Sequence, residues 1–96
     1  MAAYLVIDAE TTDPEVFAQY ASAARKIVES HGGEYVLTSE RITPASGDWS
    51  PKRIVVIRFK DKASLDGCFA SPEYLAIAPL RFRSTRGRAV IAEDDS

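Results

Sequence analysis

The sequence predicts one α+β domain over residues 1–96, in which helices cover one face of a four-stranded antiparallel sheet. Two observations lead to this fold class. Short runs rich in β-branched apolar residues recur along the chain, and two segments with apolar residues at helical spacing separate the first strand from the second and the third from the fourth. The resulting order is β-α-β-β-α-β. The composition, 46% hydrophobic and 27% charged, is typical of a globular domain.

The first strand and the first helix follow directly from local signals. Residues 4–10 form a short apolar run that predicts a strand. A helix begins at Thr12 or at Asp13-Pro14, since both offer a usual start, and it ends at Gly32-Gly33, where glycine favours the left-handed cap conformation. Its apolar side chains share one face: Val16, Phe17, Tyr20, Ala21, Ala24, Ile27 and Val28.

The second and third strands are predicted on either side of a long connection. The second strand covers residues 34–41, with Tyr35 and Leu37 on one face. Residues 42–51 contain several turn-forming residues and are either a hairpin loop or a bulged strand extension. Four consecutive β-branched residues predict the third strand at 53–59.

Two helical units and a last strand complete the domain. A helix begins at Asp61, restarts at Ser71-Pro72 and ends at Pro79, and the fourth strand covers residues 88–93. Because β-α-β crossovers are right-handed, both helical units lie on the same side of the sheet, which is the ferredoxin-like plait. In this plait we expect the first and third strands to be central and parallel to each other.

Both central strands carry apolar residues on both faces, and the helices can cover only one of them. A monomer rarely exposes a large apolar patch, so we expect a second copy of the chain to cover the other face. The sequence therefore predicts a homodimer in which the two sheets pack face to face about a two-fold axis. The residues concerned are Tyr4, Leu5, Val6 and Ile7 in the first strand and Ile54, Val55, Val56 and Ile57 in the third.

The composition excludes several classes of function. A net charge of −2 makes nucleic acid and membrane surfaces unexpected partners. One cysteine, Cys68, and one histidine leave no Cys/His zinc site, and no cofactor-binding motif is found, so neither a metal nor a cofactor is expected. The apolar runs are far shorter than the roughly 20 residues of a membrane span. The N-terminus lacks the basic region of a signal peptide, and we expect a cytoplasmic protein.

Three segments resemble a known family. They are Gly32-Gly33, the stretch Gly-Asp-Trp-Ser-Pro-Lys-Arg-Ile-Val-Val-Ile at residues 47–57, and Ser71-Pro72-Glu73-Tyr74 with Arg81 seven residues after Tyr74. Together they resemble domain of unknown function family 1330, in the dimeric α/β-barrel superfamily, over nearly the whole chain. The resemblance implies a ferredoxin-like fold whose sheets pair into a dimeric barrel, with no established reaction. More distant superfamily relatives include cofactor-free monooxygenases, lactone isomerases and haem-degrading enzymes.

Five residues are candidates for a site between the sheet and the helices. Trp49 is expected either to form a wall for a flat ligand or to pack at the dimer interface. Arg53 could clamp a carboxylate, and Arg81 and Tyr74 could complete a ligand-binding lining, although Tyr74 also suits a core position with a hydrogen-bonded hydroxyl. His31, at the end of the first helix, is the candidate catalytic acid or base, or else a C-terminal cap.

Two further groups of charged residues are predicted to form ion pairs. Arg58, in the third strand, is expected to pair with Asp8 or Glu10 in the first. A basic cluster near the C-terminus is expected to form a solvated edge with intersubunit ion pairs, rather than an anion or nucleic-acid site. The cluster consists of Arg81, Arg83, Arg86 and Arg88.

Two functional hypotheses follow from the sequence. In the first, the homodimer binds a small, anionic organic molecule, as a binding protein or as a cofactor-independent enzyme. In the second, the same residues serve folding and assembly in a non-catalytic structural or interaction dimer. A well-formed cavity with converging polar groups favours the first hypothesis, and a filled interior favours the second.

Overall fold

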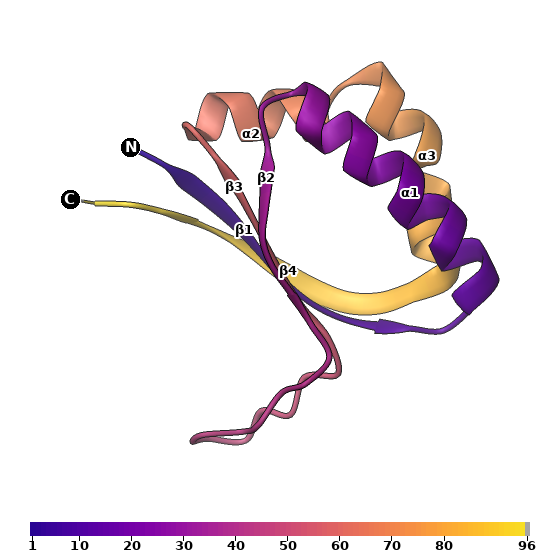
Figure 1. Ribbon diagram of the computed structural model, residues 1–96, viewed down its shortest axis with the longest axis vertical. Coiled ribbons are helices and arrows are strands. Elements are labelled where there is room, and N and C mark those ends of the chain that lie inside the picture. Colours follow the sequence, from indigo (N-terminus) through magenta and orange to yellow (C-terminus); the bar gives the residue numbers. More distant parts are fainter. Residues whose placement is uncertain (96) are drawn as a thin grey trace.

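The computed structural model describes residues 1–95, and Ser96 lies outside the described part. Helices pack on one face of a four-stranded sheet (Figure 1). The elements are β1 (Ala3–Thr11), α1 (Pro14–Ser30), β2 (Glu34–Ser39), β3 (Ile54–Phe59), α2 (Lys62–Phe69), α3 (Pro72–Ser84) and β4 (Thr85–Glu93). This order confirms the predicted α+β, ferredoxin-like plait with a four-stranded antiparallel sheet.

The strands follow the order β2-β3-β1-β4, and every neighbouring pair is antiparallel. The expectation that the first and third strands are parallel is therefore wrong. The crossover through α1 makes β1 and β2 parallel, and the reversal between β2 and β3 then turns β3 antiparallel to β1. Arg58 lies opposite Tyr4, while Asp8 lies opposite Ile54 at the other end of the pair. This register also overturns the predicted pairing of Arg58 with Asp8 or Glu10.

Side chains and glycine set the ends of α1. Of the two predicted starts, the structure uses Asp13, whose carboxylate accepts a hydrogen bond from the Val16 N–H at 3.2 Å. His31 is the C-cap, and Gly32 follows in the left-handed region with φ of +85°. The helix therefore ends where the glycine pair predicted.

Pro79 does not end the last helix, as the sequence suggested, because α3 continues to Ser84. A proline inside a helix leaves the carbonyl four residues earlier without its N–H partner. Here that carbonyl belongs to Leu75, which is 57% exposed, so water can serve as the donor. The helix tolerates the proline at its solvent side.

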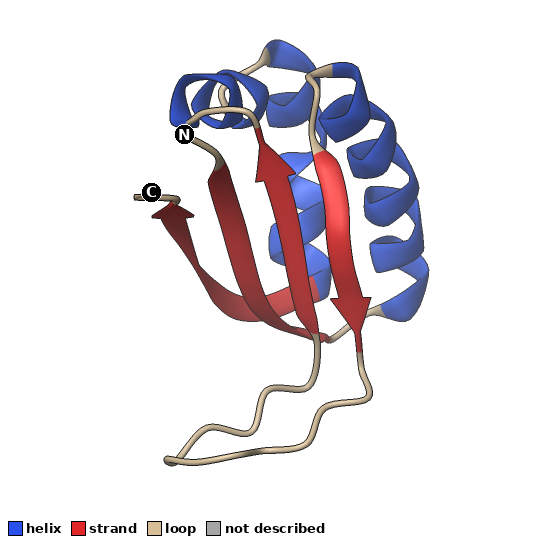
Figure 2. Cartoon of the chain, turned by 60° about the vertical axis from the view of Figure 1, so that its left-hand side comes forward, coloured by secondary structure: helices blue, strands red, loops and turns tan. Residues whose placement is uncertain are grey.

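β2 is shorter than predicted and irregular. Its register shifts between Tyr35 and Leu37, so that Tyr35 lies opposite Ile57 and Leu37 lies opposite Val56. The two side chains therefore lie on opposite faces of the sheet, and the expectation of a shared face is wrong because a bulge breaks the alternation. The connection of residues 40–53, which we call the arm, extends well beyond the end of the sheet (Figure 2).

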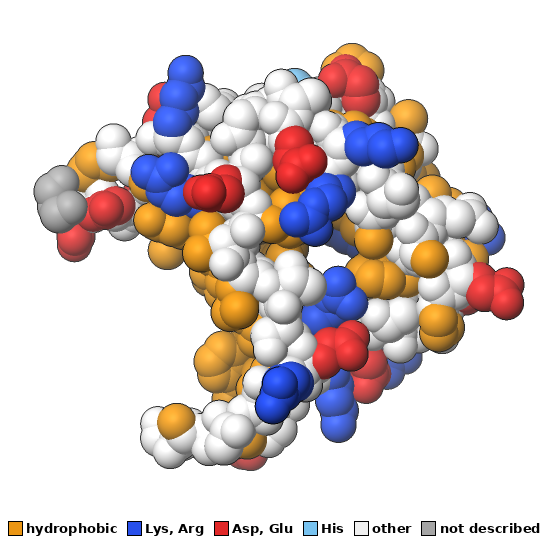
Figure 3. Space-filling view, in the orientation of Figure 1, with side chains coloured by type: hydrophobic (Ala, Val, Ile, Leu, Met, Phe, Trp, Pro, Cys, Tyr) orange, Lys and Arg blue, Asp and Glu red, His pale blue; other side chains and the backbone are white. Residues whose placement is uncertain are grey.

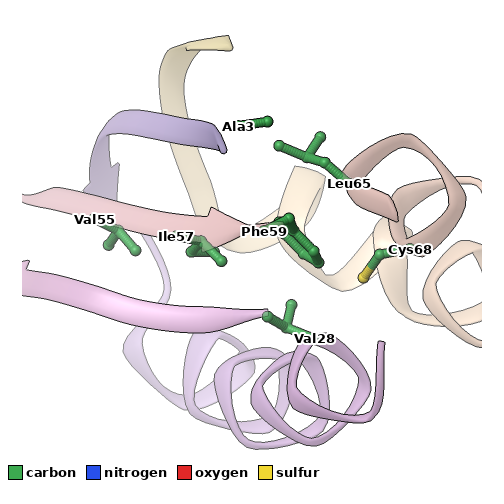
Figure 4. Packing of buried hydrophobic residues seen from close by; sticks show 7 residues of the cluster. All are labelled: Ala3, Val28, Val55, Ile57, Phe59, Leu65 and Cys68. Atoms are coloured by element: carbon green, nitrogen blue, oxygen red, sulfur yellow. The ribbon is translucent and has the colours of Figure 1, made fainter. Parts of the chain in front are cut away.

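The hydrophobic core lies at the end of the sheet where Ala3 pairs with Phe59. Phe59 is fully buried and lies among Leu65 and Cys68 of α2 and Val28 of α1 (Figure 4). Asp61 caps α2 by accepting from the Ser64 N–H at 2.8 Å. Burial raises the pKa of the Cys68 thiol to about 11, which keeps it a neutral core side chain.

Helices in the part of the chain that the structure describes are all too short or too polar to cross a membrane.

Candidate functional site

A cavity of about 370 Å³ lies between the sheet and the helices, beside the core cluster. Its floor runs along β1 from Leu5 to Thr11, and its roof comes from α1 and α3. Small side chains leave this space open. β4 passes so close to β1 that any side chain at Gly87 would collide with the backbone of Asp8 and with Ala9. The small lining residues are Ala9, Ala21, Ala24, Gly87 and Ala89.

Arg53 brings a positive charge to the cavity from the residue just before β3. Its backbone carbonyl accepts a hydrogen bond from the Ala9 N–H at 3.1 Å, which extends the β1–β3 pairing by one residue. Its guanidinium carbon lies 4.7 Å from the centre of the Phe17 ring, and Nη1 lies 3.4 Å from Oε1 of Glu40. Its Nε atom is buried and has no hydrogen-bond partner within the described residues. Leaving a buried N–H group of this kind without a hydrogen-bond acceptor destabilises the folded state strongly.

Two further arginines bring their charge to the cavity. Arg81 of α3 lies over the Phe82 ring, with 4.9 Å between the guanidinium carbon and the ring centre. Arg25 of α1 lies 4.6 Å from the centre of the Tyr35 ring in the same way. The Arg88 side chain of β4 instead lies on the helix-free face, where its Nε atom is 3.3 Å from the carboxylate of Asp8. Guanidinium groups stay protonated at any physiological pH, so the wall carries a fixed positive charge.

Two tyrosines add neutral polar groups to this wall. Burial raises the pKa of Tyr35 to about 12. Burial raises the pKa of Tyr20 still further. Both phenols therefore stay protonated, and the cavity presents neutral hydroxyl groups beside its arginines.

The structure brings Arg53 and Arg81 to the cavity wall but places the other three predicted site residues off it. Tyr74 is only 4% exposed and packs against Phe69 and Tyr20, with its hydroxyl 2.8 Å from that of Tyr20. It has the core position that the sequence offered as its alternative.

His31 caps the C-terminus of α1 and faces α3. Its Nε2 atom lies 3.2 Å from Oε2 of Glu73, in the first turn of that helix. The residue lies on the apolar arc of the helical wheel, but it comes after the last turn that packs on the sheet. The structure therefore places this candidate acid or base in a contact between helix ends, away from the cavity.

Trp49 connects the arm to the sheet face that lacks helices. Its Nε1–H donates to Oδ2 of Asp8 at 2.7 Å, and the same oxygen accepts from Nε of Arg88 at 3.3 Å. The indole borders a second hollow of about 270 Å³, which is formed by the arm and Ile54. Asp8 thus has two partners that the sequence did not suggest.

Sequence reasoning missed Phe17, Tyr20, Arg25 and Tyr35 as parts of the site. A signal was present for the first two, because they lie on the apolar face predicted for the first helix. The sequence alone does not show which residues of that face pack in the core and which line a cavity. The difference depends on the small residues that lie opposite on β4.

Solved structures with this fold come from several organisms. A protein of unknown function from Rhodopseudomonas palustris is 14% identical, with a TM-score of 0.78, covering 99% of this chain and 83% of that one. SnoaB, a cofactor-independent oxygenase from Streptomyces nogalater, is 13% identical with a TM-score of 0.69, covering 99% and 94%. A dimeric protein of unknown function with a ferredoxin-like fold, from Bacteroides fragilis, is 10% identical with a TM-score of 0.59, covering 97% and 96%. At these identities the similarity shows the fold alone.

No curated protein is similar enough to match the chain. The sequence itself gives a more specific assignment. Residues 2–94 match the domain of unknown function family DUF1330, which covers nearly the whole length. The chain therefore belongs to the DUF1330 family.

Proposed function

We propose that this protein is a homodimer that binds a small organic anion in the cavity between its sheet and helices α1 and α3. The observation that carries the proposal is the Arg53 side chain, which lines the cavity and has a buried Nε donor without a partner in residues 1–95. A carboxylate or phenolate oxygen in the cavity would accept its proton in a charge-assisted hydrogen bond.

The rest of the wall suits the body of such an anion. Its floor is apolar, with Leu5 and Ile7 of β1 and Val55 and Ile57 of β3. A cavity of about 150 Å³ is known to hold benzene. The 370 Å³ found here therefore has room for a substituted benzene or naphthalene skeleton.

The titratable groups on the cavity wall support ligand binding as the primary activity of this site. Arg53 and Arg81 provide fixed positive charge, and Tyr20 and Tyr35 provide neutral hydroxyls because burial raises the pKa of each phenol. These groups attract, hold and orient an anion. A cofactor-independent reaction would then use the same bound geometry, with chemistry that comes from the substrate.

The sheet face without helices supports the dimeric part of the proposal. Four residues form an apolar row straight across the sheet, one from each strand: Leu37, Val56, Val6 and Val90. Leu37 and Val90 are 47% and 63% exposed. In Figure 3, hydrophobic side chains gather on this concave side of the molecule, between the chain ends and the arm. A second copy packed on this row by a two-fold axis would remove it from water.

Calorimetric titration tests the binding site, with 2-naphthoate and its neutral amide, 2-naphthamide, as probes. We expect the protein to bind the carboxylate more tightly than the amide. Arg53→Met keeps the apolar stem and removes the charge, so it should weaken naphthoate binding by about 1.5 to 3 kcal/mol. Arg58→Met, on the opposite face of the sheet, is the matched control and should bind as the unmodified protein does. Equal affinities for the two probes, or unchanged binding by Arg53→Met, would overturn the proposal.

A further inference from the structure

The hydroxyl groups of Tyr20 and Tyr74 lie 2.8 Å apart and share one hydrogen bond. Each phenol has a single proton, so one hydroxyl donates and the other accepts. The accepting hydroxyl keeps its own proton, which needs a different acceptor. The cavity has a free O–H donor for a ligand only if this remaining proton belongs to the tyrosine that lines it.

Burial decides the direction of the hydrogen bond. Tyr74 is only 4% exposed, and its hydroxyl has no second hydrogen-bond partner in residues 1–95. If Tyr20 donated, the Tyr74 proton would be buried without an acceptor, which is strongly unfavourable. Tyr20 lines the cavity, where water or a ligand can accept a proton. Tyr74 is therefore the donor of the pair, and the Tyr20 O–H is free to donate into the cavity.

The Tyr20 hydroxyl acts as a donor under all ordinary conditions. Burial is the main cause of its raised pKa, while the nearby charge of Arg81 acts in the opposite direction without cancelling it. The phenol stays neutral, and it cannot act as a base at physiological pH. Its place in the site is to recognise an acceptor oxygen.

The position of Tyr20 fixes its relation to the anion site. Phe17 packs against the guanidinium of Arg53, and Tyr20 lies three residues further along α1. Three residues correspond to a rise of about 4.5 Å. Arg53 and Tyr20 line the same cavity, so a ligand whose charged group contacts Arg53 can present a second polar group to Tyr20.

We infer that Tyr20 is a specificity-determining residue that selects organic anions with a second, uncharged acceptor oxygen, such as a ketone, across an apolar ring from the charged group. This inference rests on the proposed function. It names the class of ligand as keto or acyl derivatives of small aromatic acids.

Two probes of nearly equal shape test this selection by calorimetry: 4-acetylbenzoate and 4-isopropylbenzoate. Both keep the carboxylate, and only the first has a carbonyl oxygen. We expect the unmodified protein to prefer the acetyl compound by about three- to tenfold, the effect of one neutral hydrogen bond. Tyr20→Phe should abolish the preference, whereas Tyr74→Phe should retain it, because the Tyr20 hydroxyl still faces the cavity. The readout is a ratio of affinities within one protein, and Tyr20→Leu repeats the test if the phenylalanine variant folds poorly.

Three outcomes would overturn the inference. Equal binding of both probes by the unmodified protein, with binding still dependent on Arg53, removes the role of Tyr20 and leaves the proposed function standing. A preference that appears only in Tyr74→Phe shows that Tyr20 donates to Tyr74, contrary to the direction argued above. Absence of binding by both probes, together with absence of naphthoate binding, removes the proposed function and the inference with it.

Discussion

The two faces of the sheet are built from the same strands, yet a different kind of group lacks a partner on each face. On the helix-covered face, the core cluster fills one end, and a cavity lined by Arg53 and Arg81 occupies the space beside it. On the opposite face, no helix of residues 1–95 covers the apolar row that includes Val6 and Val56 (Figure 1). One face lacks a partner for charge, and the other lacks a partner for apolar surface.

The state of the polar groups sharpens this difference. On the helix-free face, Asp8 accepts hydrogen bonds from both Trp49 and Arg88, so its carboxylate is satisfied within the chain. On the covered face, Arg53 keeps a buried donor unpaired although Glu40 contacts its outer nitrogen. This difference supports the proposal of a small anion on the helix-covered face and of a second copy of the chain on the helix-free face.

Val56→Asp should give the largest effect, because it places a charge in the centre of the apolar row. Sedimentation at micromolar concentration should give about twice 10.5 kDa for the unmodified protein. The variant should dissociate or unfold, since an uncompensated buried charge typically costs about 3 to 5 kcal/mol. Val56→Thr, which has the same shape without charge, should stay largely dimeric. A folded monomer in the unmodified protein would remove the proposed partner from this face.

A smaller effect is expected at Asp8, on the same face. Asp8→Ala removes the shared acceptor of the Trp49 N–H and the Arg88 guanidinium, and because both donors are exposed the free energy of unfolding should fall by about 0.5 to 1.5 kcal/mol. Trp49 fluorescence should change at the same time, because the indole loses its contact with the sheet. Arg58→Met, at the other end of the strand pair, is the control and should change stability by about 0.5 kcal/mol or less. Equal losses in the two variants would show that the Asp8 contacts contribute nothing specific.

The order of elements and the helix starts could be predicted because both depend on short-range patterns. The β-branched run at 54–57 and the Asp13-Pro14 start specify local geometry without help from the rest of the fold. The antiparallel β1–β3 pairing also follows from the order of elements, once the crossover and the reversal are traced through the sheet. The antiparallel pairing is therefore contained in the sequence.

The bulge after Tyr35 and the continuation of α3 past Pro79 depend on tertiary context. A bulge reverses which face each later residue occupies, and the proline is tolerated where the affected carbonyl belongs to an exposed residue, Leu75.

The site was harder to predict because its contacts join distant segments. Tyr20 and Tyr74 are 54 residues apart, and Asp8 and Trp49 are 41 residues apart. Arg53 could be found because it stands directly before a strand, where the sheet fixes its position. His31 could not be assigned from the helical wheel, because the wheel gives a direction around the helix axis and says nothing of which partner is present at its end.

The smallest effect is expected at the contact between the C-terminus of α1 and the first turn of α3. The backbone N–H of Glu73, followed by the imidazole of His31, holds the pKa of the Glu73 carboxyl below its ordinary value of 4.5. A carboxyl whose pKa is lower in the folded state stabilises the fold above its unfolded pKa, and this contribution is lost as the pH falls through the folded value. Glu73→Gln should therefore lower the thermal midpoint near neutral pH, and the difference should shrink below about pH 4.5 and vanish once the folded carboxyl is protonated. His31→Gln isolates the part of the effect that comes from the imidazole. The loss in thermal midpoint that His31→Gln causes should be smaller in the Glu73→Gln variant than in the unmodified protein. A difference between Glu73→Gln and the unmodified protein that stays constant from neutral to acid pH would show that the charge of Glu73 does not stabilise this contact.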